Sequence, residues 1–332
     1  MAAQDIRLRS NVRPVTTQFF GKSANTGKMP AKIPALPILC AFAIGWATLV
    51  AAADPAENLD PPLPRQSRQL LDGAIRGLEA HQSISAKIFQ QVDLFDKRLI
   101  GSGLYLEQRR GPVRLMRQEL RIQLGQQISS LVQVCDGHFL WTYQKLSGQE
   151  VLRRLDVARA LPAIEQAKEL PRQGKLGGLP GLGGLPKLMH ALDAAFDFQV
   201  AEPAVLRLQA DHLPVWRLSG RWKPNLVTKL LPEQAKAIES GRAADFSKLA
   251  DHLPDHVVLM LGREDLFPYR IEFCRTVDAG SDPPETRAIV TMQLFEVLFD
   301  VPIASSRFRY NPGDLDFEDE TPGLLKSLGL EE

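Results

Sequence analysis

Hydrophobic and polar residues alternate with a period of two along most of the chain from Ser83 to about residue 152. Successive side chains of a β-strand point to opposite faces, so this pattern predicts consecutive antiparallel strands with one buried face. Later segments show the same strand character after two interruptions. The predicted strands are 84–94, 100–108, 113–122, 129–135, 139–143, 196–206, 215–222, 256–262, 269–277 and 286–300.

Other segments carry apolar residues at helical spacing. Residues 66–80 place Leu70, Leu71, Ala74, Ile75 and Leu78 on one side, which predicts a helix before the first strand. Asp156 can cap a second helix that runs to about residue 170. A short helix is expected at 186–195 and a helical insertion at 226–253. The combination predicts an α+β fold in which helices cover a largely antiparallel sheet.

The clearest hairpin lies in the segment 134–141, where Asp136-Gly137 is a favoured type I′ pair between two apolar runs. The strand after this turn places Phe139, Trp141 and Tyr143 on one face. Three aromatic side chains on one side of a strand need a large cover. We therefore expect them to line the wall of an apolar site.

The N-terminal region has the features of an export signal. Residues 33–53 carry no charge, follow Lys32 and end in Ala51-Ala52-Ala53, which predicts a signal peptide over residues 1–53 with cleavage after Ala53. The basic segment before it is long for a signal peptide, which favours a start of synthesis at Met29. The alternative is a retained anchor, because 21 uncharged residues reach the length of a membrane span. Residues 54–65 are expected to form a linker.

Composition adds limits on partners and on the compartment. The chain of 332 residues is 44% hydrophobic and 24% charged, which is within the globular range. Removal of residues 1–53 takes away six basic residues and one acidic residue, leaving 34 basic and 38 acidic residues. A net charge of −4 gives no electrostatic reason to expect nucleic acid binding. Cys135 and Cys274 would remain, and two buried thiols are favoured over a disulfide.

Motifs for catalysis and metal binding do not occur in the expected contexts. His252 and His256 are four residues apart, but Pro254 between them breaks the helix that would align the two imidazoles. Cys135 and His138 lie on the two sides of the predicted hairpin turn, which does not favour a nucleophile and its base. We therefore predict no catalytic residues, no metal site, no cofactor and no enzymatic activity.

A low-complexity segment rich in Gly, Leu and Pro spans residues 174–186. No Gly-Lys-Ser/Thr sequence or parallel βαβ unit accompanies it, so a phosphate-binding loop is not expected. Its bulky side chains are apolar, which suits a lid that contacts lipid or the mouth of a cavity. A plain linker between two helices is the alternative. As a lid, it would use Leu176, Leu179, Leu182 and Leu185.

The run from Gln133 to Tyr143, with Asp-Gly followed by Leu-Trp-Thr-Tyr, resembles a segment of the LolA-like periplasmic lipoprotein carriers. The C-terminal third, with a strand that ends at Gly262 and the later sequence Phe308-Arg-Tyr-Asn-Pro-Gly313, is similar as well. The resemblance implies an incomplete antiparallel β-barrel with helices that cover the open side, over residues 66–320, and a C-terminal tail at 321–332. It also implies an apolar cavity for acyl chains. The carriers latch their lid with an arginine, and Arg98 and Arg109 lie in the corresponding region.

The sequence thus predicts an exported, periplasmic protein that holds lipid acyl chains or lipoproteins in an apolar cavity. Phe139, Trp141 and Tyr143 would form a wall, the four leucines a lid, and Trp216 a further contact. The alternative is an envelope sensor or protein-interaction module on the same fold, with a membrane-associated protein as its partner. Co-purified lipid would favour the first function, and a single protein partner the second.

Overall fold

The alternating segments form consecutive antiparallel strands in the computed structural model. It describes residues 65–330, apart from 95–96, 112, 125–126, 147, 168–182, 200, 209–210 and 279–284. The predicted signal peptide and the predicted linker therefore lie outside the described residues, except for Arg65, which begins the first described helix. The strands are β1 (Ser83–Leu94), β2 (Lys97–Arg110), β3 (Val113–Leu124), β4 (Gln127–Cys135), β5 (Phe139–Leu146), β6 (Gln149–Asp156), β7 (Phe196–Phe198), β8 (Glu202–Leu208), β9 (Asp211–Trp222), β10 (His256–Gly262), β11 (Pro268–Asp278), β12 (Glu285–Phe299) and β13 (Glu318–Asp319).

The strands make one 13-stranded sheet with the order β13-β6-β5-β4-β3-β2-β1-β12-β11-β10-β9-β7, and β8 pairs with β9 beside this path. The pairs are antiparallel except for β13 with β6. The path has two ends, at β13 and β7, so the sheet is open. This confirms the predicted α+β class with an open antiparallel sheet and helices on one side.

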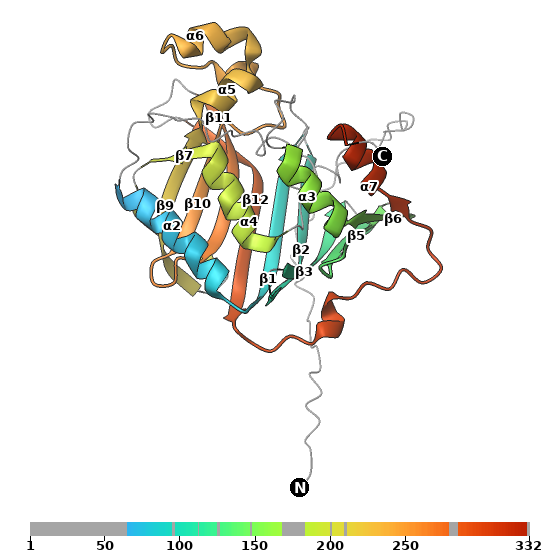
Figure 1. Ribbon diagram of the computed structural model, residues 1–332. Helices are drawn as coiled ribbons and strands as arrows, with labels where there is room; N and C mark the ends of the chain where they lie inside the picture. The colour runs from blue at the N-terminus through green and yellow to red at the C-terminus, as the bar shows by residue number, and fades with distance from the viewer. Residues whose placement is uncertain are drawn as a thin grey trace, which may run out of the picture.

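Three helices lie across one face of the sheet, which we call the inner face (Figure 1). Among the described residues the helices are α2 (Arg65–Ala80), α3 (Val157–Ala167), α4 (Gly184–Ala195), α5 (Pro224–Leu230), α6 (Ala235–Glu239) and α7 (Thr321–Ser327), with short 3-10 helices η2 (Pro232–Gln234), η3 (Phe246–Lys248) and η4 (Ser305–Phe308). Helices α2, α3 and α4 cover the inner face, whereas α5 and α6 stand at one end of it.

The main core lies between these helices and the inner face. Strand β1 contributes Ile84, Ile88 and Val92, and α2 contributes Leu71 and Leu78, all nearly inaccessible to solvent. The alternation of the sequence thus selects the inner face, because every second residue from Ile84 to Val92 is buried and all of these except Gln90 are apolar. Burial of each such side chain stabilises the fold by roughly 1.5–3 kcal/mol.

A bulge in β12 bends the sheet beside β1. Ser85 pairs with Leu298 but Lys87 pairs with Phe295, so β12 holds one residue more than β1 over this stretch. Glu296, in this bulge, adopts a positive φ of 49°. Bulges of this kind bend and twist a strand locally, which favours the curvature of an open sheet.

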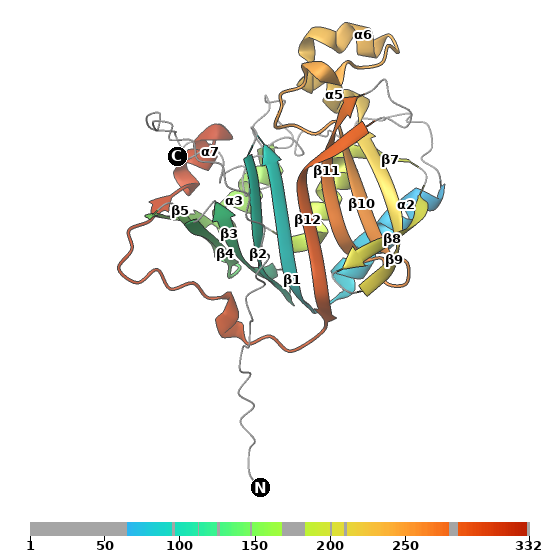
Figure 2. The same cartoon turned by 180° about the vertical axis from the view of Figure 1, so that it is seen from behind.

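The opposite face of the sheet, the outer face, is partly covered by the segment that follows β12. This segment runs from β12 past the end of the sheet to β6 (Figure 2). Phe308 of η4 packs there against Leu106 and Leu115 in a second, smaller cluster. Further on, β13 pairs with β6 at the sheet edge.

The structure corrects the predicted hairpin turn by one residue. The amide of Asp136 donates to the carbonyl oxygen of Phe139 (3.2 Å), so the two central residues are Gly137 and His138. Gly137 has a φ of 93°, whereas His138 is not in the positive region that a type I′ turn requires at both positions. The Asp136 carboxylate instead accepts the amides of His138 and Phe139 at 2.8 and 2.7 Å, which fixes the turn.

Two other segments are more divided than the sequence predicts. The expected strand 196–206 is split into β7 and β8, and the helical insertion 226–253 consists of short helices only. No helix among the described residues is long and apolar enough to cross a membrane.

Candidate functional site

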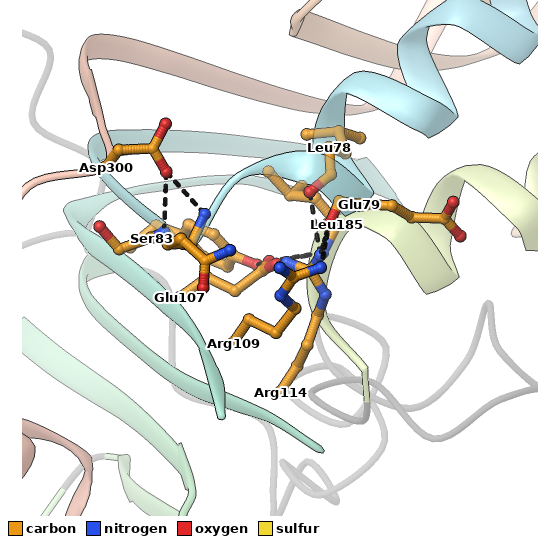
Figure 3. Close-up of polar contacts among 10 residues, drawn as sticks. Leu78, Glu79, Ser83, Glu107, Arg109, Arg114, Leu185 and Asp300 are labelled. Atoms are coloured by element: carbon orange, nitrogen blue, oxygen red, sulfur yellow. Dashed lines mark hydrogen bonds and ion pairs between the residues drawn. The ribbon is translucent and has the colours of Figure 1, made fainter. Parts of the chain in front are cut away.

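The sheet carries a buried carboxylate at the point where two helices meet it. Glu107 of β2 is fully inaccessible to solvent and faces the inner side. Its Oε1 accepts a hydrogen bond from Nη1 of Arg114 on β3, and its Oε2 accepts one from the hydroxyl of Tyr105 at 2.5 Å. Figure 3 shows Glu107 and Arg114 close together between the strands and the helices.

This carboxylate also holds the beginning of α4. The amide of Leu185 donates to Oε2 of Glu107 at 2.9 Å and lies 3.2 Å from the hydroxyl of Tyr105. The first amides of a helix lack partners within the helix, and α4 has no side-chain cap from its preceding residue. Glu107 therefore supplies the negative charge that the N-terminus of a helix favours.

Arg114 makes the corresponding contacts at the C-terminal end of α2. Its Nη2 donates to the carbonyl oxygens of Leu78 and Glu79, both at 3.0 Å. A cation at the C-terminus of a helix satisfies free carbonyl groups and complements the helix dipole. One ion pair thus joins the end of α2 to the start of α4 across β2 and β3. We call Tyr105, Glu107, Arg114 and the amide of Leu185 the helix latch.

Two glycines make the close approach of α4 to Glu107 feasible. Gly183 and Gly184 both have positive φ, 81° and 64°. A Cβ atom on Gly184 would lie 2.1 Å from Oε2 of Glu107. The Gly/Leu-rich segment therefore ends in a turn that needs glycine for its backbone conformation and for space.

The hydroxyl group of Tyr105 stays protonated in the helix latch. Burial and the neighbouring Glu107 carboxylate raise the pKa of Tyr105 well above its ordinary value. The phenol thus stays neutral and donates, while Glu107 accepts. Both charged members are withdrawn from water, with side chains 11% exposed for Arg114 and 0% for Glu107. Breaking such a pair by removal of one partner typically costs about 3–5 kcal/mol.

The arginine at the centre of the latch differs from the two that the sequence singled out. Arg98 is exposed and pairs with Asp93 at 2.8 Å. Arg109 is exposed and donates one hydrogen bond of 3.2 Å to the carbonyl oxygen of Glu79, at the edge of the latch. The signal for Arg114 was its position in the strand pattern, because it shares the inner face with Met116. A charged residue at an inward position of a strand indicates a buried polar contact.

The aromatic stripe of β5 lies on the outer face, away from the helices. Leu140 belongs to the main core, so its neighbours Phe139 and Trp141 point to the other side. Trp141 is covered there by Tyr310 and Phe317, with ring centroids at 5.6 and 5.2 Å. The sequence groups these side chains on one face, and only the structure shows that the helices cover the other face. The reason is that periodicity groups residues by face but does not say which face receives the helices.

An arginine completes the outer cluster. The guanidinium of Arg154 lies 4.8 Å from the ring centre of Phe139 and 4.4 Å from that of Phe317. It also pairs with Asp319 of β13 at 2.7 Å. Tyr143 is on the same face and partly buried. The cover that three aromatic residues require is therefore supplied in part by the C-terminal segment.

Of the other predicted contact residues, Leu185 and Trp216 pack into the main core, and three leucines lie outside the described residues. Leu185 is buried in the main core and contributes its amide to the latch. Trp216 of β9 is partly buried, packs against the same core and carries Arg263 over its ring at 4.6 Å. Leu176, Leu179 and Leu182 lie outside the described residues.

The two cysteines are buried free thiols. Cys135 is in the main core. Cys274 of β11 lies opposite His256 of β10 in the strand register, on the outer face of the sheet. Burial raises the pKa of both, that of Cys274 to about 12. Neither thiol is set up as a nucleophile, because reactivity requires the thiolate. Within the described ranges no group of His, Cys, Asp and Glu side chains is arranged to hold a metal ion.

Comparison with known proteins gives matches among solved structures. Neither a family model nor a curated protein matches the chain. A DUF1329 family protein from Desulfovibrio piger is 10% identical with a TM-score of 0.32, over 73% of this chain and 97% of that one. LprF from Mycobacterium bovis is 10% identical with a TM-score of 0.33, over 74% and 97%. A domain from Vibrio parahaemolyticus is 8% identical with a TM-score of 0.29, over 73% and 97%. That third structure is described as a putative outer membrane lipoprotein-sorting protein domain.

Proposed function

We propose that the protein binds the acyl chain of a lipid or lipoprotein against the inner face of its sheet, where α4 now packs. The helix latch would control when α4 moves away. The observation that carries this proposal is the buried ion pair of Glu107 and Arg114 beneath the start of α4. We propose further that the protein acts outside the cytoplasm, because residues 33–53 have the character of an export signal.

A buried ion pair is a poor device for stability alone. Apolar side chains of similar volume at such positions are often as stabilising or more so, because the two charges lose their hydration. The same pair is well suited to a contact that opens. When α4 leaves the sheet, both charges regain water, which offsets part of the cost of lost contacts. This difference favours a releasable helix over a purely structural one.

The face that α4 covers is apolar enough for an acyl chain. Leu185, Met189, Leu192 and Ala195 of α4 are buried in the main core, to which β3 contributes Met116. Transfer of about ten CH₂ groups from water gains roughly 8 kcal/mol at 0.8 kcal/mol each. Burial of four such helix side chains is worth a similar amount, so an acyl chain can replace α4 at little net cost.

Binding of a fluorescent acyl probe to delipidated protein tests the proposal. The wild type should show saturable uptake with one site for each chain. Met116→Asp, which puts a charge on the inner face of β3 where the acyl chain would lie, should abolish tight binding, and melting curves should confirm that the variant is folded. Trp141→Ala, on the outer face, is the matched control and should leave uptake unchanged.

Two results would overturn the proposal. One is a lack of saturable uptake by folded wild-type protein. The other is loss of uptake in Trp141→Ala with normal uptake in Met116→Asp, which would move the site to the outer face. Mass spectrometry of the natively purified protein adds a check, because a stably bound protein partner without lipid favours the sensor function.

A further inference from the structure

Two arginines converge on one helix end at the solvent edge of the inner face. Arg109 of β2 and Arg114 of β3 are directly opposite each other in the strand register, so their side chains leave the sheet on the same face. Both donate to the carbonyl oxygen of Glu79, Arg109 from Nη1 at 3.2 Å and Arg114 from Nη2 at 3.0 Å. Figure 3 shows the two side chains beside each other. We call Arg109 and Arg114 the arginine pair.

The end of α2 does not require both arginines. Arg114 alone donates to the carbonyl oxygens of Leu78 and Glu79, and it has its counter-ion in Glu107. Arg109 adds one longer bond, from an exposed position, to a carbonyl that already accepts from Arg114. Like charges directly opposite each other on a strand pair destabilise a sheet. Helix capping thus explains Arg114 but not a second arginine opposite it.

The charge of Arg109 has no carboxylate partner among the described residues. Each labelled carboxylate of Figure 3 is bonded to a different basic side chain: Glu107 to Arg114, Glu79 to His190 and Asp300 to His81. The Glu79 side chain also points away from the arginine pair in Figure 3. Two guanidinium charges therefore stand against one carboxylate and about half a negative charge at the end of α2. The site keeps a net positive charge.

The arginine pair lies where the inner face passes from water to the core. The next position of β3 on this face after Arg114 is Met116, which is 1% exposed and belongs to the main core. Such positions are about 7 Å apart along a strand. Arg109 itself is exposed, and the side chain of Arg114 is 11% exposed. A ligand whose acyl chain crosses Met116 can therefore keep its head group at the arginine pair, in contact with water.

The free donors of the pair select an oxyanion. Arg109 uses only Nη1 in its bond to Glu79, which leaves Nε and Nη2 for a ligand. A guanidinium presents its donors as a planar fork that matches two oxygens of a carboxylate or phosphate. A neutral ester or hydroxyl group would leave the extra positive charge without a counter-ion.

We propose that the arginine pair binds the acidic head group of the acylated ligand, a carboxylate or phosphodiester with a single negative charge. A single charge matches the one guanidinium that lacks a counter-ion. This inference rests on the proposed acyl-chain binding. It adds the class of head group and the end of the inner face at which the head group lies, while the chain runs from Met116 into the space under α4.

Two pairs of ligands with matched acyl chains test the inference on the full-length protein, by displacement of one fluorescent acyl probe. The first pair is a long-chain fatty acid and its methyl ester, and the second is a phosphatidylglycerol and a diacylglycerol. In at least one pair the wild type should bind the anionic member about tenfold more tightly, as expected for a hydrogen bond to a charged group. The pair that shows this preference identifies the anion as a carboxylate or a phosphodiester. Added salt should reduce the preference.

Arg109→Gln should remove the preference by weakening the anionic ligand about tenfold and leaving the neutral ligand unchanged. Its melting temperature should stay near that of the wild type, because Arg114 keeps its bonds to both carbonyl oxygens. Arg110→Gln is the matched control, because it removes the same charge from an exposed arginine on the opposite face of β2. This control should keep the full preference.

Equal affinities within both pairs for the wild type would overturn the inference and leave acyl-chain binding intact. An equal loss of preference in the two variants would also overturn it, because net charge and not the arginine pair would then be the cause. So would weaker binding of all ligands by Arg109→Gln together with a lower melting temperature, which would indicate a structural role. A failure of the probe and of every ligand to bind would overturn both proposals.

Discussion

Replacement of Glu107 by Gln is the most direct perturbation of the helix latch. The substitution keeps the shape of the side chain but removes the charge and one of two acceptor oxygens. Glu107 accepts from Arg114, Tyr105 and Leu185, and a Gln side chain can serve only one side of this arrangement. The change therefore leaves a buried guanidinium without its counter-ion.

The size of the effect follows from burial. Removal of one partner of a buried ion pair costs about 3–5 kcal/mol, and Glu107 is fully buried. Arg114 keeps its hydrogen bonds to the carbonyl oxygens of Leu78 and Glu79. We therefore expect a loss near the lower limit, about 3 kcal/mol of the free energy of unfolding.

Glu119→Gln is the matched control, because it makes the same chemical change in an exposed pair. Glu119 binds Arg117 on the outer face and has a side chain that is 39% exposed. Exposed pairs contribute less than about 1 kcal/mol. Urea unfolding measures both losses, and native-state hydrogen exchange should show that Glu107→Gln deprotects the amides of α4 more than those of β10.

Equal losses in the two variants would refute the assignment of the latch. So would a loss in Glu107→Gln that is spread evenly over α4 and β10, because the latch would then stabilise the whole fold and not the attachment of one helix.

Two further predictions concern local geometry and pH. Gly184→Ala should destabilise the protein more than Gly111→Ala. Both residues have a φ near 60°, and an alanine in this conformation costs about 1–2 kcal/mol. Only at Gly184 would the added Cβ atom also collide with Glu107, because nothing lies near Gly111. Equal shifts of the denaturation midpoints would contradict the steric argument. The second prediction concerns Asp300, whose pKa is lowered by hydrogen bonds from the His81 side chain and the Gln82 amide. Its folded pKa lies below the unfolded one, so this contribution is present above the unfolded value of about 3.9 and is lost as pH falls through the folded pKa. Melting temperatures of the wild type and Asp300→Asn should differ at pH 7 and converge below about pH 4; a constant difference would exclude this contribution.

Most of the sheet was predictable because its information is local. In β1, the alternation from Ile84 to Val92 both selects the buried face and specifies a strand. The same holds for α2, whose apolar residues recur at helical spacing. The bounds of β10 match the prediction at both ends, since the flanking Pro254 and Gly262 mark the change of structure.

The candidate site was less predictable because it joins distant segments. Glu107 and Leu185 are 78 residues apart, and nothing local to either shows that a carboxylate and a helix amide will meet. The polar residues of the inner face had a weak sequence signal, since Gln133, Thr142 and Gln144 interrupt apolar positions. Which of them share a row depends on the register of four strands.

The sequence by itself determined most of the strands, the helices that cover the sheet, the class of fold and the grouping of Phe139, Trp141 and Tyr143 on one face. Only the tertiary structure decided that this face is the outer one, under Tyr310 and Phe317. The physical reason is that periodicity is a property of one strand and fixes two faces without ordering them. Which face receives helices depends on how segments far apart in the chain pack, and that choice placed the helix latch between the sheet and the ends of α2 and α4.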